Sequence, residues 1–186
     1  IAKYIKNSYA GPLFMKEILS INMVLNNKKN PITCIIGGSK ISTKLGVIIS
    51  LIKKVDHLII VGAMANNFIK FKGNKIGKSL IEVGSEKIIK EIYKSADKNN
   101  CKIITPSDFA VSETTDGKAN FKDLVNVKDN EIILDIGPQT IERINKIIDI
   151  SKTVLWNGPA GYFENRNFSN GTISIAKKIS DNTNKD

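Results

Sequence analysis

The chain has 186 residues, of which 41% are hydrophobic and 25% are charged, as in an ordinary globular protein with one sizeable core. No apolar run approaches the ~20 residues of a membrane-spanning helix, which excludes a helical membrane protein. The formal net charge of +10 invites comparison with nucleic-acid-binding proteins, but every basic residue except Arg143 and Arg166 is a lysine. Base readout and bidentate phosphate contacts favour arginine, so we expect no nucleic-acid partner.

The chain also lacks the residues of several common sites. Cys34 and Cys101 have no CxxC spacing, so they indicate neither a disulfide framework nor a zinc site. We interpret them as small buried residues of a cytoplasmic protein, where thiols stay reduced. His57 is the one histidine, and no GxSxG motif accompanies it, which argues against a Ser/His/Asp hydrolase.

Apolar runs and helical periodicities alternate from one end of the chain to the other. Strands are expected over residues 32–36, 56–61, 102–105, 131–135 and 152–156. Helices are expected over residues 13–25, 40–54, 85–96, 139–150 and 172–180, with Pro12 in the first turn of the first helix and Ser85 capping another. One more helix is expected after Gly62-Ala63-Met64 and through Phe71. A small hairpin with a turn at Asp116–Gly117 is expected between residues 109 and 130.

This order predicts an α/β fold with a doubly wound, mostly parallel, Rossmann-like sheet between two helical layers, a three-layer α/β/α arrangement. The expected strands read as continuous apolar runs, which is typical of parallel sheets covered on both faces. The last helix should lead into a further strand, and the first residues include no initiator Met. We therefore expect an incomplete last strand and a chain that is part of a longer protein.

One stretch, residues 32–44, combines a strand, two glycines and the start of a helix. Gly37 and Gly38 can let a ligand approach the backbone closely, and the helix start should offer free N–H groups to an anion. Lys40 and Lys44 should share one face of that helix. The pattern predicts a phosphate site, although an ordinary βα turn before a solvated helix face has the same glycines.

Other glycine-bearing turns should lie at the same edge of the sheet. They are Gly62–Ala63, Gly137–Pro138 and Asn157–Pro159, each directly after an expected strand. Ligands of such sheets bind at the carboxyl ends of the strands. The repetition favours a ligand site over a chance turn.

Five segments, GGSKISTK, VGAMANNF, TPSDF, LDIGPQT and WNGPAGYFE, resemble in order and spacing the nucleotide-binding half of phosphoglycerate kinases. The resemblance runs from about residue 10 to residue 178. It implies that residues 1–11 are the tail of an N-terminal domain with the hinge, and that residues 12–186 are an incomplete nucleotide-binding domain. The implied reaction is reversible phosphoryl transfer between 1,3-bisphosphoglycerate and MgADP, giving 3-phosphoglycerate and MgATP.

The resemblance also assigns residues to the site: Gly37, Gly38, Lys40, Lys44, Gly62, Ala63, Leu134, Asn157, Pro159 and Glu164. Lys40 would be catalytic by stabilising the phosphoryl group in transit, and Lys44 would contact the nucleotide phosphates. Phosphoryl transfer needs such positioning and charge stabilisation.

The remaining assignments concern the nucleoside. Gly62–Ala63 would lie beside adenine, Leu134 would form an apolar wall, Asn157 and Pro159 would line the base and phosphate side, and Glu164 would accept hydrogen bonds from the ribose hydroxyls. On the residues alone, Leu134 could equally be core and Glu164 a surface carboxylate.

Three positions depart from the family pattern: Ser39 stands where alanine is frequent, and Ala63 and Ile133 stand where glycine occurs. Their added atoms would narrow the base pocket.

The resemblance implies that Mg²⁺ arrives with the nucleotide, that no metal ligand lies within this chain, and that the full-length protein is a cytoplasmic monomer in glycolysis. The chain alone is expected to bind ADP or ATP and to be nearly inactive, because the domain that holds the phosphoglycerate substrate would lie outside it. A non-catalytic nucleotide-binding α/β module remains the main alternative. A basic nucleic-acid-associated protein, suggested by the charge alone, is the other.

Overall fold

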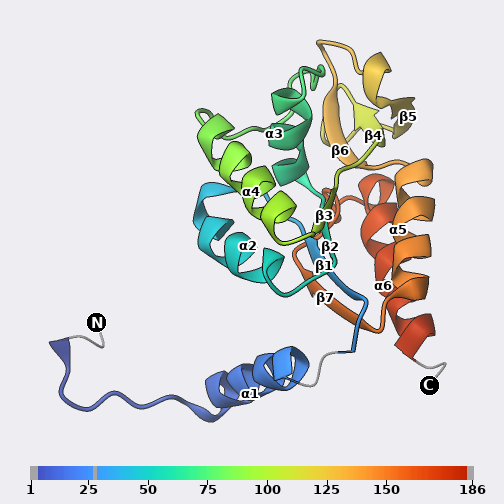
Figure 1. Ribbon diagram of the computed structural model, residues 1–186. Helices are drawn as coiled ribbons and strands as arrows, with labels where there is room; N and C mark the ends of the chain where they lie inside the picture. The colour runs from blue at the N-terminus through green and yellow to red at the C-terminus, as the bar shows by residue number, and fades with distance from the viewer. Residues whose placement is uncertain (1–3, 27–28, 184–186) are drawn as a thin grey trace.

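The computed structural model describes residues 4–26 and 29–183, which form two sheets with helices packed around them (Figure 1). The helices are α1 (Pro12–Asn26), α2 (Leu45–Ile52), α3 (Ala63–Phe71), α4 (Glu86–Lys98), α5 (Pro138–Ile150) and α6 (Asn170–Thr183). The strands are β1 (Ile32–Ile36), β2 (His57–Ile60), β3 (Lys102–Ile104), β4 (Asp108–Ser112), β5 (Asn120–Asp123), β6 (Ile132–Ile136) and β7 (Thr153–Asn157). Short 3₁₀ turns occupy Ser42–Lys44, Leu124–Asn126 and Arg166–Phe168.

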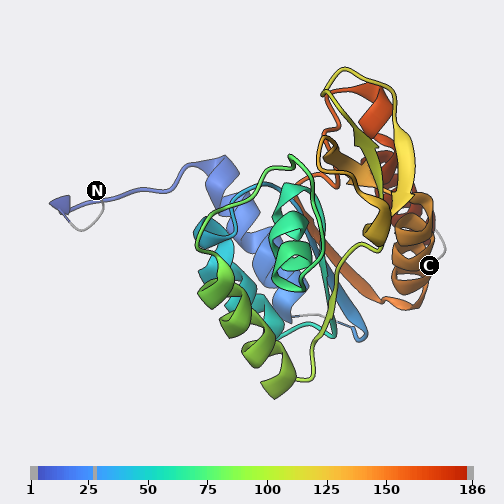
Figure 2. The same cartoon turned by 90° about the horizontal axis from the view of Figure 1, so that it is seen from above.

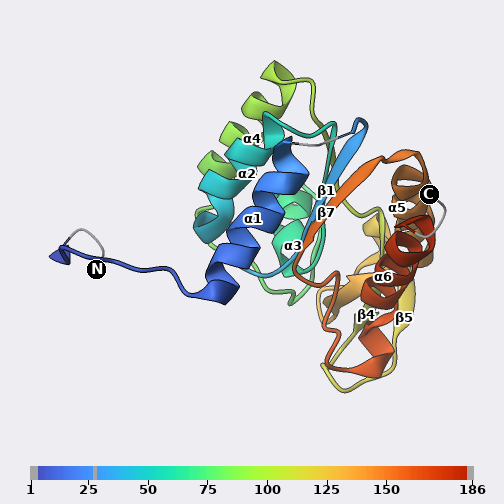
Figure 3. The ribbon, with the colours of Figure 1, turned by 90° about the horizontal axis from the view of Figure 1, so that it is seen from below.

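The larger sheet has the strand order β3-β2-β1-β7, and all its strand pairs are parallel. Helices α2, α3 and α4 cover one face, and α5 and α6 cover the other (Figures 1 and 3). The side chains of β1 alternate between these layers, since Ile36 belongs to the same buried cluster as Phe68 and Ile92, whereas Ile35 belongs to that of Ile144. The expected three-layer, doubly wound α/β fold is confirmed.

The prediction that residues 131–135 form a strand of the parallel sheet is wrong. This segment is β6, which pairs antiparallel with β4 in a separate sheet of order β5-β4-β6. Two parallel neighbours must be joined by a crossover of about a dozen residues or more, usually an α-helix. Strands β4, β5 and β6 follow one another through short connections without an α-helix, so they pair antiparallel. The expected hairpin between residues 109 and 130 is confirmed as the β4–β5 pair, and the smaller sheet lies beyond one end of the parallel sheet (Figure 1).

Helix α1 begins at the expected Pro12 and exposes much apolar surface. Leu13 is 74% exposed and Leu19 is 59% exposed. The side chains of Ile21, Val24 and Leu25, further along this helix, lie outside the described part of the structure. Residues 4–11 extend away from the rest of the chain (Figure 2), and no helix within the two described ranges is long and apolar enough to cross a membrane.

The two cysteines are buried and unpaired, as expected. Burial raises the pKa of the Cys34 thiol to about 12 and that of Cys101 to about 11, so neither is a ready thiolate nucleophile. Ser85 does precede α4, but its hydroxyl donates to Asn67 Oδ1 (3.2 Å) rather than capping the helix. The expected capping interaction is therefore wrong, because a tertiary partner takes the hydroxyl.

Candidate functional site

Three glycine-bearing turns meet at the carboxyl ends of β1, β2 and β7. The Gly37 N–H donates to the Asn157 carbonyl oxygen (2.8 Å), which ties the β1 turn to β7. The Gly62 N–H donates to the Ala160 carbonyl oxygen (3.0 Å), which ties the β2 turn to the loop after β7. The turns therefore hold one another by direct backbone contacts.

Such close packing requires residues without a Cβ. A methyl group on Gly37 would overlap the carbonyl oxygen of Pro159. Gly38 (φ +112°) and Gly62 (φ +66°) also adopt backbone conformations that L-residues rarely take. The glycines predicted from sequence to form a ligand site thus have a structural role, because they let the three turns pack together.

The prediction for Gly137–Pro138 needs correction. Gly137 follows β6, so it belongs to the antiparallel sheet and does not lie on the edge formed by β1, β2 and β7. Its N–H donates to the Asp108 carbonyl oxygen (2.8 Å), and a Cβ there would overlap the Asp108 carboxylate. This glycine serves the start of α5, where Asp108 accepts hydrogen bonds from the Gln139 and Thr140 N–H groups (2.9 and 2.7 Å).

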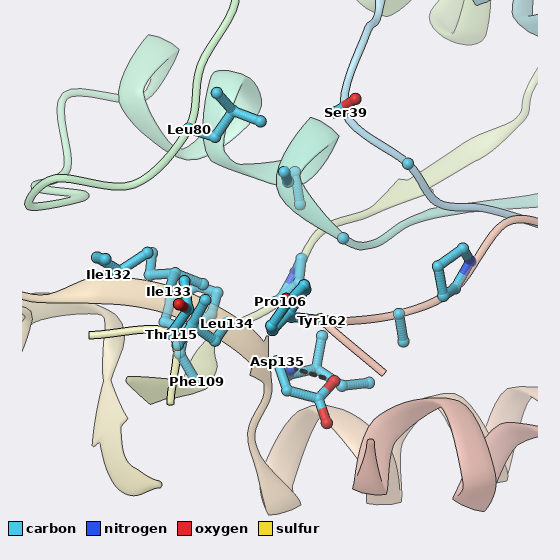
Figure 4. Close-up of a pocket in the computed structure, with 18 of the residues that line it drawn as sticks. Ser39, Leu80, Pro106, Phe109, Thr115, Ile132, Ile133, Leu134, Asp135 and Tyr162 are labelled. Atoms are coloured by element: carbon cyan, nitrogen blue, oxygen red, sulfur yellow. Dashed lines mark hydrogen bonds between the residues drawn. The ribbon is translucent and has the colours of Figure 1, made fainter. Parts of the chain in front are cut away.

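A cavity of about 450 Å³ opens between the glycine turns and the antiparallel sheet (Figure 4). Its lining includes six of the residues singled out from sequence: Gly38, Gly62, Ala63, Leu134, Pro159 and Glu164. Leu80 lies on one side, across from Ile132 and Ile133 of β6 (Figure 4). The size and the largely apolar lining suit a small organic ligand with a flat apolar part.

Sequence analysis did not single out several residues of this lining, among them Leu80, Phe109 and Tyr162. Leu80 lies in an irregular segment without periodicity, and the sequence pattern placed Phe109 in a hairpin rather than at a ligand site. The three departures from the family pattern, Ser39, Ala63 and Ile133, all line the cavity. All three departures therefore affect the surface of the cavity.

Lys44 lies at the glycine-turn end of the cavity. Its Nζ donates to the Gly37 carbonyl oxygen (2.8 Å) and to Asn157 Oδ1 (2.7 Å). Lys44 thus contacts Gly37 and Asn157, and these three predicted site residues lie next to the cavity without lining it. An ammonium group has three donors, so one remains for a ligand at the neighbouring Gly38.

Lys40 is exposed and precedes the 3₁₀ turn Ser42–Lys44, while α2 begins only at Leu45. The prediction that Lys40 and Lys44 share a helix face is therefore wrong. The expected free N–H groups are also partly occupied, because Glu82 Oε2 accepts hydrogen bonds from the N–H groups of Ile41 (2.8 Å) and Ser42 (3.1 Å). Glu82 lies about 40 residues further along the chain, so the residue pattern around Lys40 does not indicate this contact.

Asp135 of β6 holds the start of α6. Its Oδ2 accepts a hydrogen bond from the Gly171 N–H (2.8 Å), and its Oδ1 accepts one from the Ile136 N–H (2.9 Å). The neighbouring Leu134 carbonyl oxygen accepts one from the Tyr162 N–H (2.6 Å). Burial raises the pKa of Asp135 to about 6, against the opposing effect of these N–H donors.

Acidic and metal-ligating residues are otherwise sparse near the cavity. Within residues 4–26 and 29–183, no group of three or more His, Cys, Asp or Glu side chains could hold a metal ion. Glu164 is exposed at the rim, on the loop after β7. The site therefore offers glycine backbone, an apolar wall and lysines, which suits a phosphate-bearing ligand better than a bare metal ion.

The family model for phosphoglycerate kinase matches residues 1–186. Curated phosphoglycerate kinases similar to the chain include one from Wolbachia sp. subsp. Brugia malayi, 44% identical over 179 residues, and one from Orientia tsutsugamushi, 42% identical over 179 residues. These alignments cover 96% and 95% of the chain but 45% and 44% of the relatives. The chain thus spans about half the length of the curated relatives it matches.

Solved structures give the same result. The phosphoglycerate kinase of Coxiella burnetii matches with a TM-score of 0.87 and 37% identity, over 94% of this chain and 45% of that chain. The enzyme from Pyrococcus horikoshii OT3 matches with a TM-score of 0.75 and 28% identity, over 92% and 44%.

Proposed function

This chain belongs to the phosphoglycerate kinase family, and we propose that it is the part of such an enzyme that binds MgADP and MgATP. The proposed reaction is reversible phosphoryl transfer between 1,3-bisphosphoglycerate and MgADP, giving 3-phosphoglycerate and MgATP. The observation that carries the proposal is the cavity beside Gly38, Gly62 and Pro159, with the Lys44 ammonium at one end.

The nucleoside would occupy the wider, apolar part of the cavity. Adenine would lie beside Gly62–Ala63, between Leu80 and the β6 wall that includes Leu134. Glu164 at the rim would accept hydrogen bonds from the ribose hydroxyls. Shape and apolar contact would hold the base, since few polar side chains line this part.

The phosphates would lie toward the glycine turns. Lys44 would use its remaining donor, and the exposed Lys40 would contact the nucleotide phosphates and stabilise the charge of the phosphoryl group during transfer. Asn157 would orient Lys44 by the 2.7 Å hydrogen bond, and Pro159 would close the phosphate side. Mg²⁺ would arrive as part of the nucleotide substrate.

We further propose that the 186-residue chain alone transfers phosphoryl groups at a negligible rate. The chain spans about 45% of its relatives' length, and its two arginines, Arg143 and Arg166, lie outside the cavity lining. The acid substrate would therefore bind to residues of a longer, monomeric and cytoplasmic protein. Turnover of ADP and the acyl phosphate by the purified chain would contradict this part.

Calorimetric titration of MgADP into the purified chain tests nucleotide binding. We expect saturable binding by the wild type and a loss of about tenfold or more in Lys44→Ala, because hydrogen bonds to charged groups contribute ~1.5–3 kcal/mol. Lys90→Ala removes the same charge on the exposed surface of α4 and should bind normally.

Circular dichroism on each variant must show a folded chain before the affinities are compared. The absence of MgADP binding by folded wild type, or equal affinities in wild type and Lys44→Ala, would refute the proposal. MgADP binding alone is also compatible with the alternative, a non-catalytic nucleotide-binding module. That alternative would be refuted if the longer protein catalyses the reaction and Lys40→Ala abolishes its activity.

A further inference from the structure

The segment that carries Lys40 is fixed on both sides. Before it, the Gly38 carbonyl oxygen accepts a hydrogen bond from the Met64 N–H (2.7 Å) at the start of α3. After it, the Ile41 side chain is fully buried in the core. Ser39 and Lys40 therefore form a short exposed bridge between two anchored residues.

Glu82 completes the second anchor. Its Oε2 accepts hydrogen bonds from the backbone N–H groups of Ile41 (2.8 Å) and Ser42 (3.1 Å), the two residues that follow Lys40. Hydrogen bonds from Ser42, with a smaller contribution from Ile41 and Lys40, hold the pKa of Glu82 below its usual value. The carboxylate is thus charged at neutral pH and binds donors that would otherwise face solvent at the start of the turn.

Glu82 is itself held by the element that follows the Gly62 turn. Its N–H donates to Asn67 Oδ1 (2.8 Å), and Asn67 Nδ2 donates to the Met64 carbonyl oxygen (3.2 Å). The preceding residue of α3, Asn66, donates from Nδ2 to the Leu80 carbonyl oxygen (3.1 Å). Two buried amides of α3 therefore fix the loop that supplies both Leu80 of the base wall and Glu82.

We infer that Glu82 is a positioning residue for Lys40, acting through the Ile41 and Ser42 N–H groups to hold the lysine's backbone in the orientation that phosphate binding requires. The inference rests on the proposed nucleotide function of the cavity. Leu80, two residues before Glu82, is held through its backbone by Asn66, so removal of the Glu82 carboxylate should release Ile41 and Ser42 without changing the base wall. Glu82 itself does not line the cavity and is not a catalytic residue.

The charge of Glu82 makes the test decisive, because electrostatics alone predicts the opposite result. Removing a carboxylate near the site should strengthen the binding of an anion such as ADP. If Glu82 positions Lys40, Glu82→Ala should instead weaken MgADP binding by about fivefold, the low end of typical coupling between sites. Adenosine, which lacks phosphates, should bind wild type and variant equally.

Three further variants separate positioning from general damage. Glu82→Gln keeps one acceptor oxygen and should lose less MgADP affinity than Glu82→Ala. Glu91→Ala removes the same charge from the exposed surface of α4 and should not weaken binding. In Lys40→Ala, the additional Glu82→Ala change should have no further effect on MgADP affinity, because the group that Glu82 positions is gone.

A nuclear magnetic resonance measurement tests positioning without any nucleotide. The backbone amide of Lys40 should have a high order parameter in the wild type and a clearly lower one in Glu82→Ala, with unchanged values in β1. Equal order at Lys40 in both proteins, tighter MgADP binding by Glu82→Ala, or additive effects of the two substitutions would each overturn the inference. If the order parameter falls but the wild type binds no MgADP, the proposed function fails while the positioning contact stands.

Discussion

Replacing Gly37 by alanine would introduce a methyl group at the most crowded point of the glycine turns. The ideal Cβ position overlaps the Pro159 carbonyl oxygen and lies 2.9 Å from the Gly158 carbonyl oxygen, and both are backbone atoms that cannot rotate away. Overpacking of this kind costs about 1–3 kcal/mol, and we expect at least ~3 kcal/mol because the Gly37–Asn157 hydrogen bond would also be strained.

The free energy of unfolding can be measured by urea denaturation followed by circular dichroism. For a chain of this size, ~3 kcal/mol corresponds to a melting temperature lower by roughly 6–12 °C. Gly46→Ala is the matched control, since Gly46 is exposed within α2 and a Cβ there would meet nothing within 4 Å. That substitution should stabilise the chain by about 0.5–1 kcal/mol. Equal stability of Gly37→Ala and wild type would show that the turns do not pack as described.

Two other predictions concern buried charges. The raised pKa of Asp135, about 6 against an ordinary 3.8, means that the folded state keeps this proton longer than the unfolded state. As pH rises from about 4.5 to 5.5, the free energy of unfolding of the wild type, measured by urea denaturation, should fall by roughly 1 kcal/mol relative to that of Asp135→Asn. The same pH dependence in both proteins would contradict this. Lys122 and Glu131 form an ion pair at 2.7 Å with side chains only 14% and 8% exposed. Lys122→Ala should therefore cost about 3 kcal/mol in the same assay, whereas Lys146→Ala, in a pair that is largely exposed, should change stability by no more than ~0.5 kcal/mol.

Local sequence patterns were sufficient for most of the parallel sheet. Strands β1 and β2 are short apolar runs followed at once by glycine and then by helical periodicity, so their type and order were readable. The β6 segment has the same composition, and the α5 periodicity that follows it made it look like one more parallel strand. Its partner is decided by the connection from β4, which contains no α-helix, and that is a property of topology rather than of composition.

The same distinction between local patterns and long-range contacts applies to the candidate site. Gly37, Gly62 and the turn after β7 were predicted because glycine has a specific backbone role directly after a strand. Lys40 was assigned to a helix because its spacing from Lys44 fits one, but Glu82 binds the N–H groups that follow it and the helix begins later. A contact between residues 40 positions apart leaves no periodicity for sequence analysis to detect.

The cavity therefore depends on two kinds of structure with different requirements. One side is made of backbone turns at the edge of the parallel sheet, where only glycine fits at Gly37 and Gly62. The other side is made of side chains from β6 and from the loop that contains Leu80, so substitutions such as Ile133 can be accommodated there. Asn67 connects α3, which follows the Gly62 turn, to the Leu80 loop by accepting a hydrogen bond from the Glu82 N–H, and the Leu134 carbonyl oxygen connects β6 to the loop after β7 by accepting one from the Tyr162 N–H. Variation in the side-chain wall can thus coexist with fixed glycine turns, provided that these two connections remain.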